Sequence, residues 1–138
     1  MFTKESPILL VDDSISMRET VKSILNGEGY RNIQSAENGK EALIKIRGAL
    51  QQGKMYKLIF LDWNMPEMDG ITFLKACRAE LGIQDVAIVM LTAHADQKSI
   101  VKALQSGATS YITKPVSSAE LLKKTAQVAT WFTNKVKT

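Results

Sequence analysis

The sequence has only one cysteine, Cys77, which excludes an intramolecular disulfide and suits a reducing compartment. Long apolar runs are also missing, because the longest, residues 86–91, is far shorter than the roughly 20 residues of a membrane span. The N-terminal residues do not show the basic, apolar and small-residue regions of a signal peptide. These absences favour a cytoplasmic protein that has no membrane partner.

Acidic residues are fewer than basic ones, with 14 Asp and Glu against 18 Lys and Arg, so that the net charge is +4. A basic balance can indicate a nucleic-acid partner. However, aromatic residues do not alternate with the basic ones as a nucleic-acid platform requires. We therefore expect a scattered, solvated surface charge and no nucleic-acid partner.

Internal repeats, low-complexity stretches and linkers are absent too, and 138 residues are enough for one domain with its own core. Short apolar segments at residues 8–11, 33–36, 58–61, 86–91 and 111–113 alternate with segments of helical periodicity. The first helical segment is capped by Asp13 or Ser14, and two others cover about residues 39–50 and 118–134. We expect a single domain over residues 1–138 in which each of five strands precedes a helix.

Each helical segment carries an apolar stripe that we expect to face the core. The members of these stripes are Met17, Val21, Ile24, Leu25, Ala42, Leu43, Ile46, Leu50, Ile71, Phe73, Leu74, Cys77, Leu81, Ile100, Val101, Leu104, Leu121, Leu122, Thr125, Val128, Ala129 and Phe132. Strands that alternate with helices pair in parallel through right-handed crossovers, which predicts an α/β fold with helices on both faces of an open sheet. One common strand order for such a sheet is 2-1-3-4-5, but the spacing alone does not determine it.

Polar side chains stand where the apolar strands end. Asp12 and Asp13 follow the first strand, and Asp62, Thr92 and Lys114 follow the third, fourth and fifth. The carboxyl ends of parallel strands face one crevice, where three carboxylates repel one another unless a cation such as Mg²⁺ joins them. One carboxylate can act as a nucleophile, while a hydroxyl and an ammonium group suit the oxygens of a transferring phosphoryl group. The pattern predicts phosphoryl transfer onto an aspartate.

The motifs around these residues resemble those of the response-regulator receiver family in its single-domain, CheY-like form. The matching segments are ILLVDD at residues 8–13, LDWNMPEMDG at 61–70, LTA at 91–93, GA at 107–108, and Tyr111 with Lys114-Pro115. The resemblance covers about residues 7–134. It implies a flavodoxin-like, doubly wound (βα)5 fold with a parallel five-stranded sheet in the order 2-1-3-4-5.

The resemblance also implies a two-component signalling switch of the chemotaxis type. Asp62 would accept a phosphoryl group from the phosphohistidine of a histidine kinase. Mg²⁺ would be held by Asp12, Asp13, Asp62 and the backbone carbonyl of Asn64. Such a protein is not an enzyme in the usual sense, because it catalyses only its own phosphorylation and slow dephosphorylation.

Other matched residues would carry the signal away from the phosphorylated aspartate. Thr92 and Lys114 would contact the phosphoryl oxygens, a cis bond before Pro115 would aim the lysine, and Thr92 and Tyr111 would form the switch. The implied partners of this monomer are the kinase, a downstream target on the face of the fourth helix, fifth strand and fifth helix, and a phosphatase. No DNA-binding or catalytic output domain is expected.

Two alternatives remain at this stage. A receiver can serve only as a docking module that is never phosphorylated. A phosphatase of the haloacid-dehalogenase class also uses a strand-end aspartate, but it expects that residue on the first strand and a second carboxylate two positions later, where this chain has Asn64.

His94, two residues after Thr92, stands where receivers vary and tune dephosphorylation, although an exposed loop histidine is the simpler interpretation. The stretch 47–57 is longer than in the compact family form.

Overall fold

The strands form a single parallel sheet in the computed structural model, which describes residues 2–65, 68–80, 85–93 and 96–137. Within these residues the strands are β1 (Ile8–Val11), β2 (Ile33–Ala36), β3 (Leu58–Asp62), β4 (Ala87–Thr92) and β5 (Ser110–Thr113). Their order is β2-β1-β3-β4-β5. The predicted α/β, flavodoxin-like fold with strand order 2-1-3-4-5 is therefore confirmed.

The burial of each strand follows its composition. The three inner strands, β1, β3 and β4, are apolar along almost their whole length and are buried on both faces. The two edge strands, β2 and β5, mix polar and apolar residues and are partly exposed. The inner strands thus hold the residues at their carboxyl ends in fixed positions next to one another.

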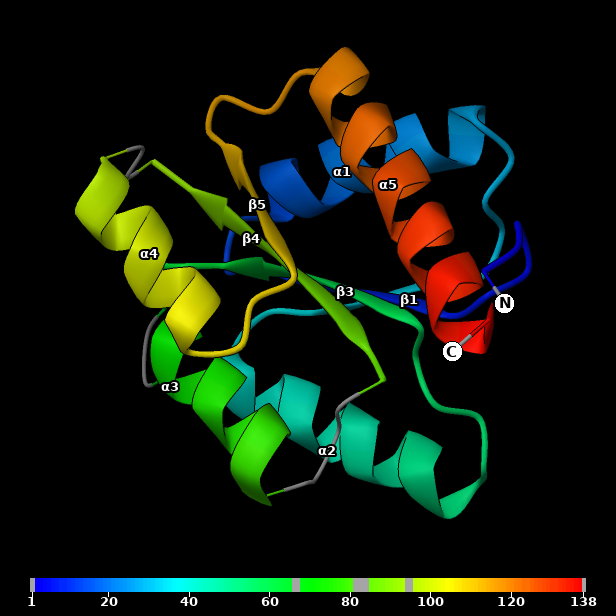
Figure 1. Ribbon diagram of the computed structural model, residues 1–138, viewed down its shortest axis with the longest axis horizontal. Helices are drawn as coiled ribbons and strands as arrows, with labels where there is room; N and C mark the ends of the chain where they lie inside the picture. Colours follow the sequence, from blue (N-terminus) through cyan, green and yellow to red (C-terminus); the bar gives the residue numbers. More distant parts are fainter. Residues whose placement is uncertain (1, 66–67, 81–84, 94–95, 138) are drawn as a thin grey trace.

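The described helices are α1 (Ile15–Gly27), α2 (Gly39–Gln51), α3 (Gly70–Lys75), the π-helical turn η1 (Ala76–Glu80), α4 (Gln97–Gln105) and α5 (Ser118–Lys137). Figure 1 shows the sheet between α1 and α5 on one side and α2 and α3 on the other. Five helices begin at a side chain that accepts a hydrogen bond from the N–H three residues on, namely Ser14, Asn38, Asp69, Asp96 and Ser117. None of the described helices combines the length and apolar character that crossing a membrane requires.

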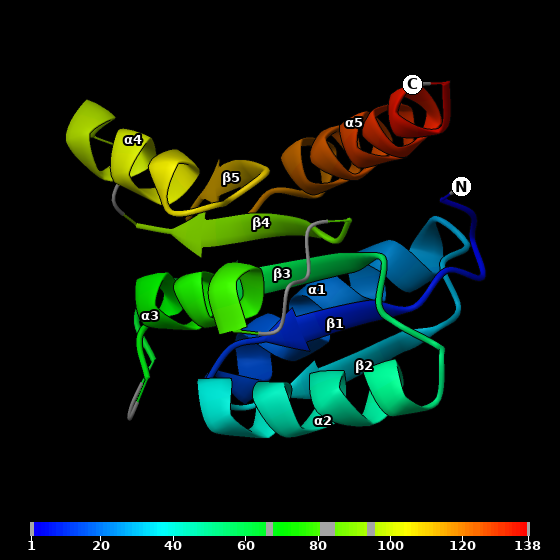
Figure 2. The ribbon, with the colours of Figure 1, turned by 60° about the horizontal axis from the view of Figure 1, so that its bottom comes forward.

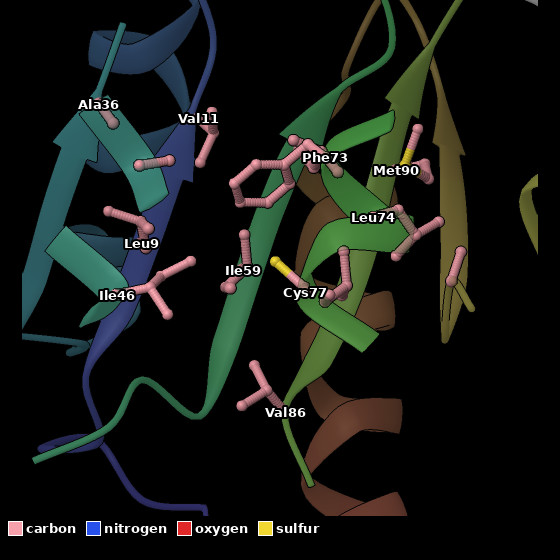
Figure 3. Close-up of a cluster of buried hydrophobic side chains, with 14 of the residues drawn as sticks. Leu9, Val11, Ala36, Ile46, Ile59, Phe73, Leu74, Cys77, Val86 and Met90 are labelled. Atoms are coloured by element: carbon pink, nitrogen blue, oxygen red, sulfur yellow. The ribbon is translucent and has the colours of Figure 1, made fainter. Parts of the chain in front are cut away.

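Two apolar clusters hold the layers together, one on each face of the sheet. The cluster under α2 and α3 includes Ile46, Ile59, Phe73 and Cys77, which point toward one another in Figure 3. The other cluster joins β1, β3 and β4 to α1 and α5. Cys77 is fully buried, and burial raises the pKa of its thiol to about 12, so this residue packs in the core as expected.

Three residues of the predicted stripes are exposed. Leu50, Val101 and Leu104 are 42%, 41% and 44% exposed, so their predicted inward position is wrong. Periodicity identifies the apolar side of a helix, but it does not show how closely that side approaches the sheet. α4 illustrates this, because Ala103 is its only buried residue. Leu81 lies outside the described residues.

The third helix also differs from a continuous α-helix, because it changes to the π-helical turn η1 after Lys75. Arg78 in this turn donates from Nη1 to the carbonyl of Val86 (2.8 Å) and from Nε to the carbonyl of Gly107 (3.0 Å). Gly107 has φ +116°, and a Cβ at this position would lie 2.7 Å from Cγ of Arg78. The side chain of Arg78 therefore links the third helix to the connection between α4 and β5.

Candidate functional site

Two of the predicted carboxylates stand side by side at the end of the central strands. Val11 pairs with Leu61 in the sheet, so the residues that follow them, Asp12 and Asp62, are adjacent at the carboxyl edge. Asp13 comes next along the chain, and its exposed carboxylate completes the group. One ligand oxygen from each of the three carboxylates lies within 4.8 Å of the other two. The structure therefore brings Asp12, Asp13 and Asp62 together.

Asp12 is the most constrained member of this group. It is 2% exposed, and its Oδ1 accepts a hydrogen bond from the backbone N–H of Ser14 at 2.9 Å. Its Oδ2 is buried and accepts no hydrogen bond. Burial raises the pKa of Asp12, the Ser14 bond opposes this effect, and the charge of Asp62 raises the pKa further. A buried oxygen without a hydrogen bond beside two other carboxylates is an unfavourable arrangement that a cation would relieve.

Lys114, which follows the edge strand β5, brings a positive charge to the carboxylates. Its Nζ donates to Oδ1 of Asp62 at 2.8 Å and lies 3.6 Å from Oδ2 of Asp12. Burial by itself would lower the pKa of Lys114, but the hydrogen bond to Asp62 and the charges of Asp12 and Asp62 outweigh this effect, so the pKa is raised. The ammonium group therefore stays protonated beside Asp62.

The other predicted residues lie on β4 and β5. Thr92 ends β4, is buried, and accepts a backbone hydrogen bond from Lys114 at 2.7 Å. The bond between Lys114 and Pro115 is cis, the conformation that the resemblance implies. Tyr111 pairs with Met90 in the sheet and is half-buried against the cluster under α2 and α3. His94 lies outside the described residues.

Gly70 packs closely against the backbone of Asp62 and Trp63. The N–H of Gly70 donates to the carbonyl of Trp63 at 2.8 Å. A Cβ at residue 70 would lie 2.7 Å from the carbonyl oxygen of Asp62 and 3.0 Å from Cα of Trp63. Only glycine allows this close approach. Asn64 stands two residues after Asp62, and its side chain is exposed. A metal contact through its backbone carbonyl stays a prediction.

Gly70 and Arg18 also contact the acidic residues of the site, although neither was predicted to have a role there. Arg18 on α1 donates from Nη1 to the backbone carbonyl of Asp12, which joins the helix to the acidic group. Gly70 ends the LDWNMPEMDG segment that matches the family, and this segment was the available signal. Arg18 stands four residues after the capping Ser14, and nothing in its local sequence indicates this contact.

The donor set fits Mg²⁺. This ion prefers oxygen ligands, and it usually combines one or two carboxylates with water and phosphate oxygens. The three carboxylates, with an Oδ2 of Asp12 that accepts no hydrogen bond, meet that preference. They are the one described group of acidic, cysteine or histidine side chains that is close enough to hold a metal.

Comparison with known proteins points to one family. The family described as response regulator receiver domain matches residues 8–126. The chain is 38% identical over 124 residues to chemotaxis protein CheY-3 of Vibrio cholerae, which covers 90% of this chain and 92% of that protein.

Solved structures agree with this match. The structure of the chemotaxis response regulator CheY4 of Vibrio cholerae is similar with a TM-score of 0.79 and 35% identity, over 90% of this chain and 98% of that one. A chain of the CheX–CheY–BeF3–Mg²⁺ complex from Borrelia burgdorferi is similar with a TM-score of 0.80 and 29% identity, over 89% of this chain and 88% of that one.

Proposed function

The chain belongs to the response regulator receiver family, and we propose on this basis that it is a phosphorylation-activated switch in the cytoplasm. It accepts a phosphoryl group on Asp62 from the phosphohistidine of a histidine kinase and then changes its affinity for a downstream protein. The observation that carries this proposal is the meeting of three carboxylates within 4.8 Å with the Lys114 ammonium 2.8 Å from Asp62. The protein catalyses only its own phosphorylation and slow dephosphorylation.

The chemistry at Asp62 is a nucleophilic substitution at phosphorus. A carboxylate oxygen of Asp62 forms the new P–O bond as the P–N bond to the kinase histidine breaks, and the bonding electrons remain with the departing imidazole. Lys114 pairs with charge on the phosphoryl oxygens, and the hydroxyl of Thr92 donates to one of them. In support of these roles, Thr92 ends β4, and the N–H of Lys114, just after β5, donates to the carbonyl of Thr92.

The acidic group would hold Mg²⁺ through Asp12, Asp13, Asp62 and the backbone carbonyl of Asn64. When bound, this ion neutralises the carboxylates and the phosphoryl oxygens, so that an anionic donor can approach. Asp12 contributes the buried oxygen. The N–H of Ser14 holds the other oxygen of its carboxylate, and Arg18 holds its backbone carbonyl.

The signal leaves the site through β4 and β5. A phosphoryl group that draws Thr92 inward opens space into which the ring of Tyr111 can move. Figure 2 shows β5 between α4 and α5, and this face exposes Val101 and Leu104 beside Lys98 and Lys102. We assign the downstream target to this face, where the lysines favour an acidic partner.

The names of the relatives support a pathway and a further protein partner. CheY-3 and CheY4 of Vibrio cholerae are named for chemotaxis, which supports a chemotaxis role here. A receiver crystallised with CheX supports a second protein partner, and we propose a phosphatase. The chain acts as one monomeric receiver domain over residues 1–138.

The test is an amide NMR comparison with and without beryllofluoride and Mg²⁺. We expect shifts around Thr92 that extend to Tyr111 and α4, while α2 remains nearly unchanged. In Thr92→Ala the shifts near Asp62 should persist and those at Tyr111 should shrink. A Tyr111 response that does not depend on the Thr92 hydroxyl contradicts the coupling, and no shifts at all would favour the docking module that is never phosphorylated.

A further inference from the structure

An ammonium group of α5 lies over the ring of the proposed switch tyrosine. Nζ of Lys124 is 5.0 Å from the centroid of Tyr111, within the range of cation–π interactions. The two residues belong to different layers. Tyr111 packs against the cluster under α2 and α3, whereas α5 belongs to the cluster on the opposite face. Because β5 is the edge strand, Lys124 can reach around the sheet to the ring.

The Tyr111 ring is the partner that the described residues provide for the Lys124 ammonium group. Among the described residues, no carboxylate forms an ion pair with Lys124, not even Glu120 one turn earlier on the same helix. Lys124 is itself half-buried, so its side chain is not free in solvent. α4 buries only Ala103 and so offers little packing of its own that could hold Tyr111 in place.

We propose that Lys124 is a positioning residue that holds the Tyr111 ring at the edge of the sheet in the unphosphorylated protein and so opposes the switch. This role rests on the proposed phosphorylation of Asp62 and on the movement of Tyr111 that follows it. An inward movement of the ring breaks the contact with the ammonium group. An acidic partner that pairs with Lys124 would release the ring in the same way, which couples target binding to the position of Tyr111.

The strength of the contact between Lys124 and Tyr111 sets how much its loss should change the affinity for a phosphoryl mimic. A partly exposed cation–π pair contributes roughly a two- to fivefold bias between the two ring positions. Coupling between two sites is reciprocal, so a protein that lacks the contact should bind a phosphoryl mimic more tightly by the same factor. Beryllofluoride with Mg²⁺ serves as the mimic.

The experiment compares Lys124→Met with Lys123→Met, which removes the same charge from an exposed neighbour on α5. Beryllofluoride is titrated in saturating Mg²⁺, and binding is followed by the fluorescence of Trp63, beside Asp62, with every variant made in a Trp131→Phe background. We expect Lys124→Met to bind about two- to fivefold more tightly, and Lys123→Met and Lys124→Arg to match the parent. In the presence of Tyr111→Leu, Lys124→Met should have no further effect.

A second readout follows the Tyr111 ring in the free protein. With ¹³C-labelled tyrosine, the ring signals of Tyr111 in free Lys124→Met should move part of the way toward their beryllofluoride-bound positions. Equal affinities in Lys124→Met and Lys123→Met, or an effect that survives in Tyr111→Leu, would overturn the positioning role while the switch stands. If the parent protein shows no response to beryllofluoride, the proposed function fails as well.

Discussion

Nζ of Lys114 lies 2.8 Å from Oδ1 of Asp62, although the two residues are 52 positions apart and their strands are separated by β4. The lysine side chain crosses the end of β4 and is 25% exposed. It is the cation that the described structure provides for a group of three carboxylates.

Lys114→Met should therefore destabilise the protein in the absence of divalent ions. Removing one partner of a largely buried pair leaves the other charge uncompensated, and we expect the free energy of unfolding to fall by about 1–3 kcal/mol. Urea denaturation at low ionic strength measures this change. Lys102→Met on the exposed surface of α4 is the control and should stay within about 0.5 kcal/mol of the parent. Equal stability of both variants would show that the ion pair contributes nothing.

Mg²⁺ should stabilise the folded protein, because a ligand that binds only the folded state raises its stability by mass action. At a tenfold excess over Kd the gain is about 1.4 kcal/mol, which thermal unfolding detects as a rise in Tm. Asp13→Asn should lose most of this rise. Asp69→Asn retains a capping side chain at α3 and should respond like the parent. The same rise in Asp13→Asn and the parent would reject the metal site.

Gly70→Ala should disturb the site, because the new Cβ would lie 2.7 Å from the carbonyl oxygen of Asp62. We expect a loss of about 1–3 kcal/mol in unfolding free energy and a weaker response to Mg²⁺. Gly48→Ala on α2 is the matched control, since a Cβ there meets no atom within 4 Å. It should gain up to about 1 kcal/mol, because alanine favours a helix more than glycine does. A Gly70→Ala protein as stable and as responsive as the parent would refute the close approach.

The fold was predictable where the sequence signal is local. The apolar runs that end at Asp12, Asp62 and Thr92 identified three inner strands, because strands buried on both faces need continuous apolar residues. The strand order came from the family resemblance, since spacing does not determine which strands are neighbours. The exposure of Val101 and Leu104 was missed because it depends on how loosely α4 packs, which is a property of the assembled layers.

The candidate site was predictable for a topological reason. Parallel strands bring their ends to one edge, so residues as distant as Asp12 and Lys114 meet without any local signal in the sequence. Contacts that depend on side-chain direction were not predictable. Arg18 on the carbonyl of Asp12 and Lys124 over Tyr111 are of this kind, because each needs the relative position of two elements to be known.

Phosphorylation of Asp62 is the central claim, and it can be measured directly. The protein is incubated with acetyl phosphate and Mg²⁺, and intact-mass spectrometry follows the addition of one phosphoryl group. Asp62→Asn keeps the shape of the side chain but removes the anionic oxygen that attacks phosphorus, while Asp69→Asn changes an exposed aspartate seven residues later. We predict labelling of the parent and of Asp69→Asn and none of Asp62→Asn. Full labelling of Asp62→Asn, or no labelling of the parent protein, would contradict the account.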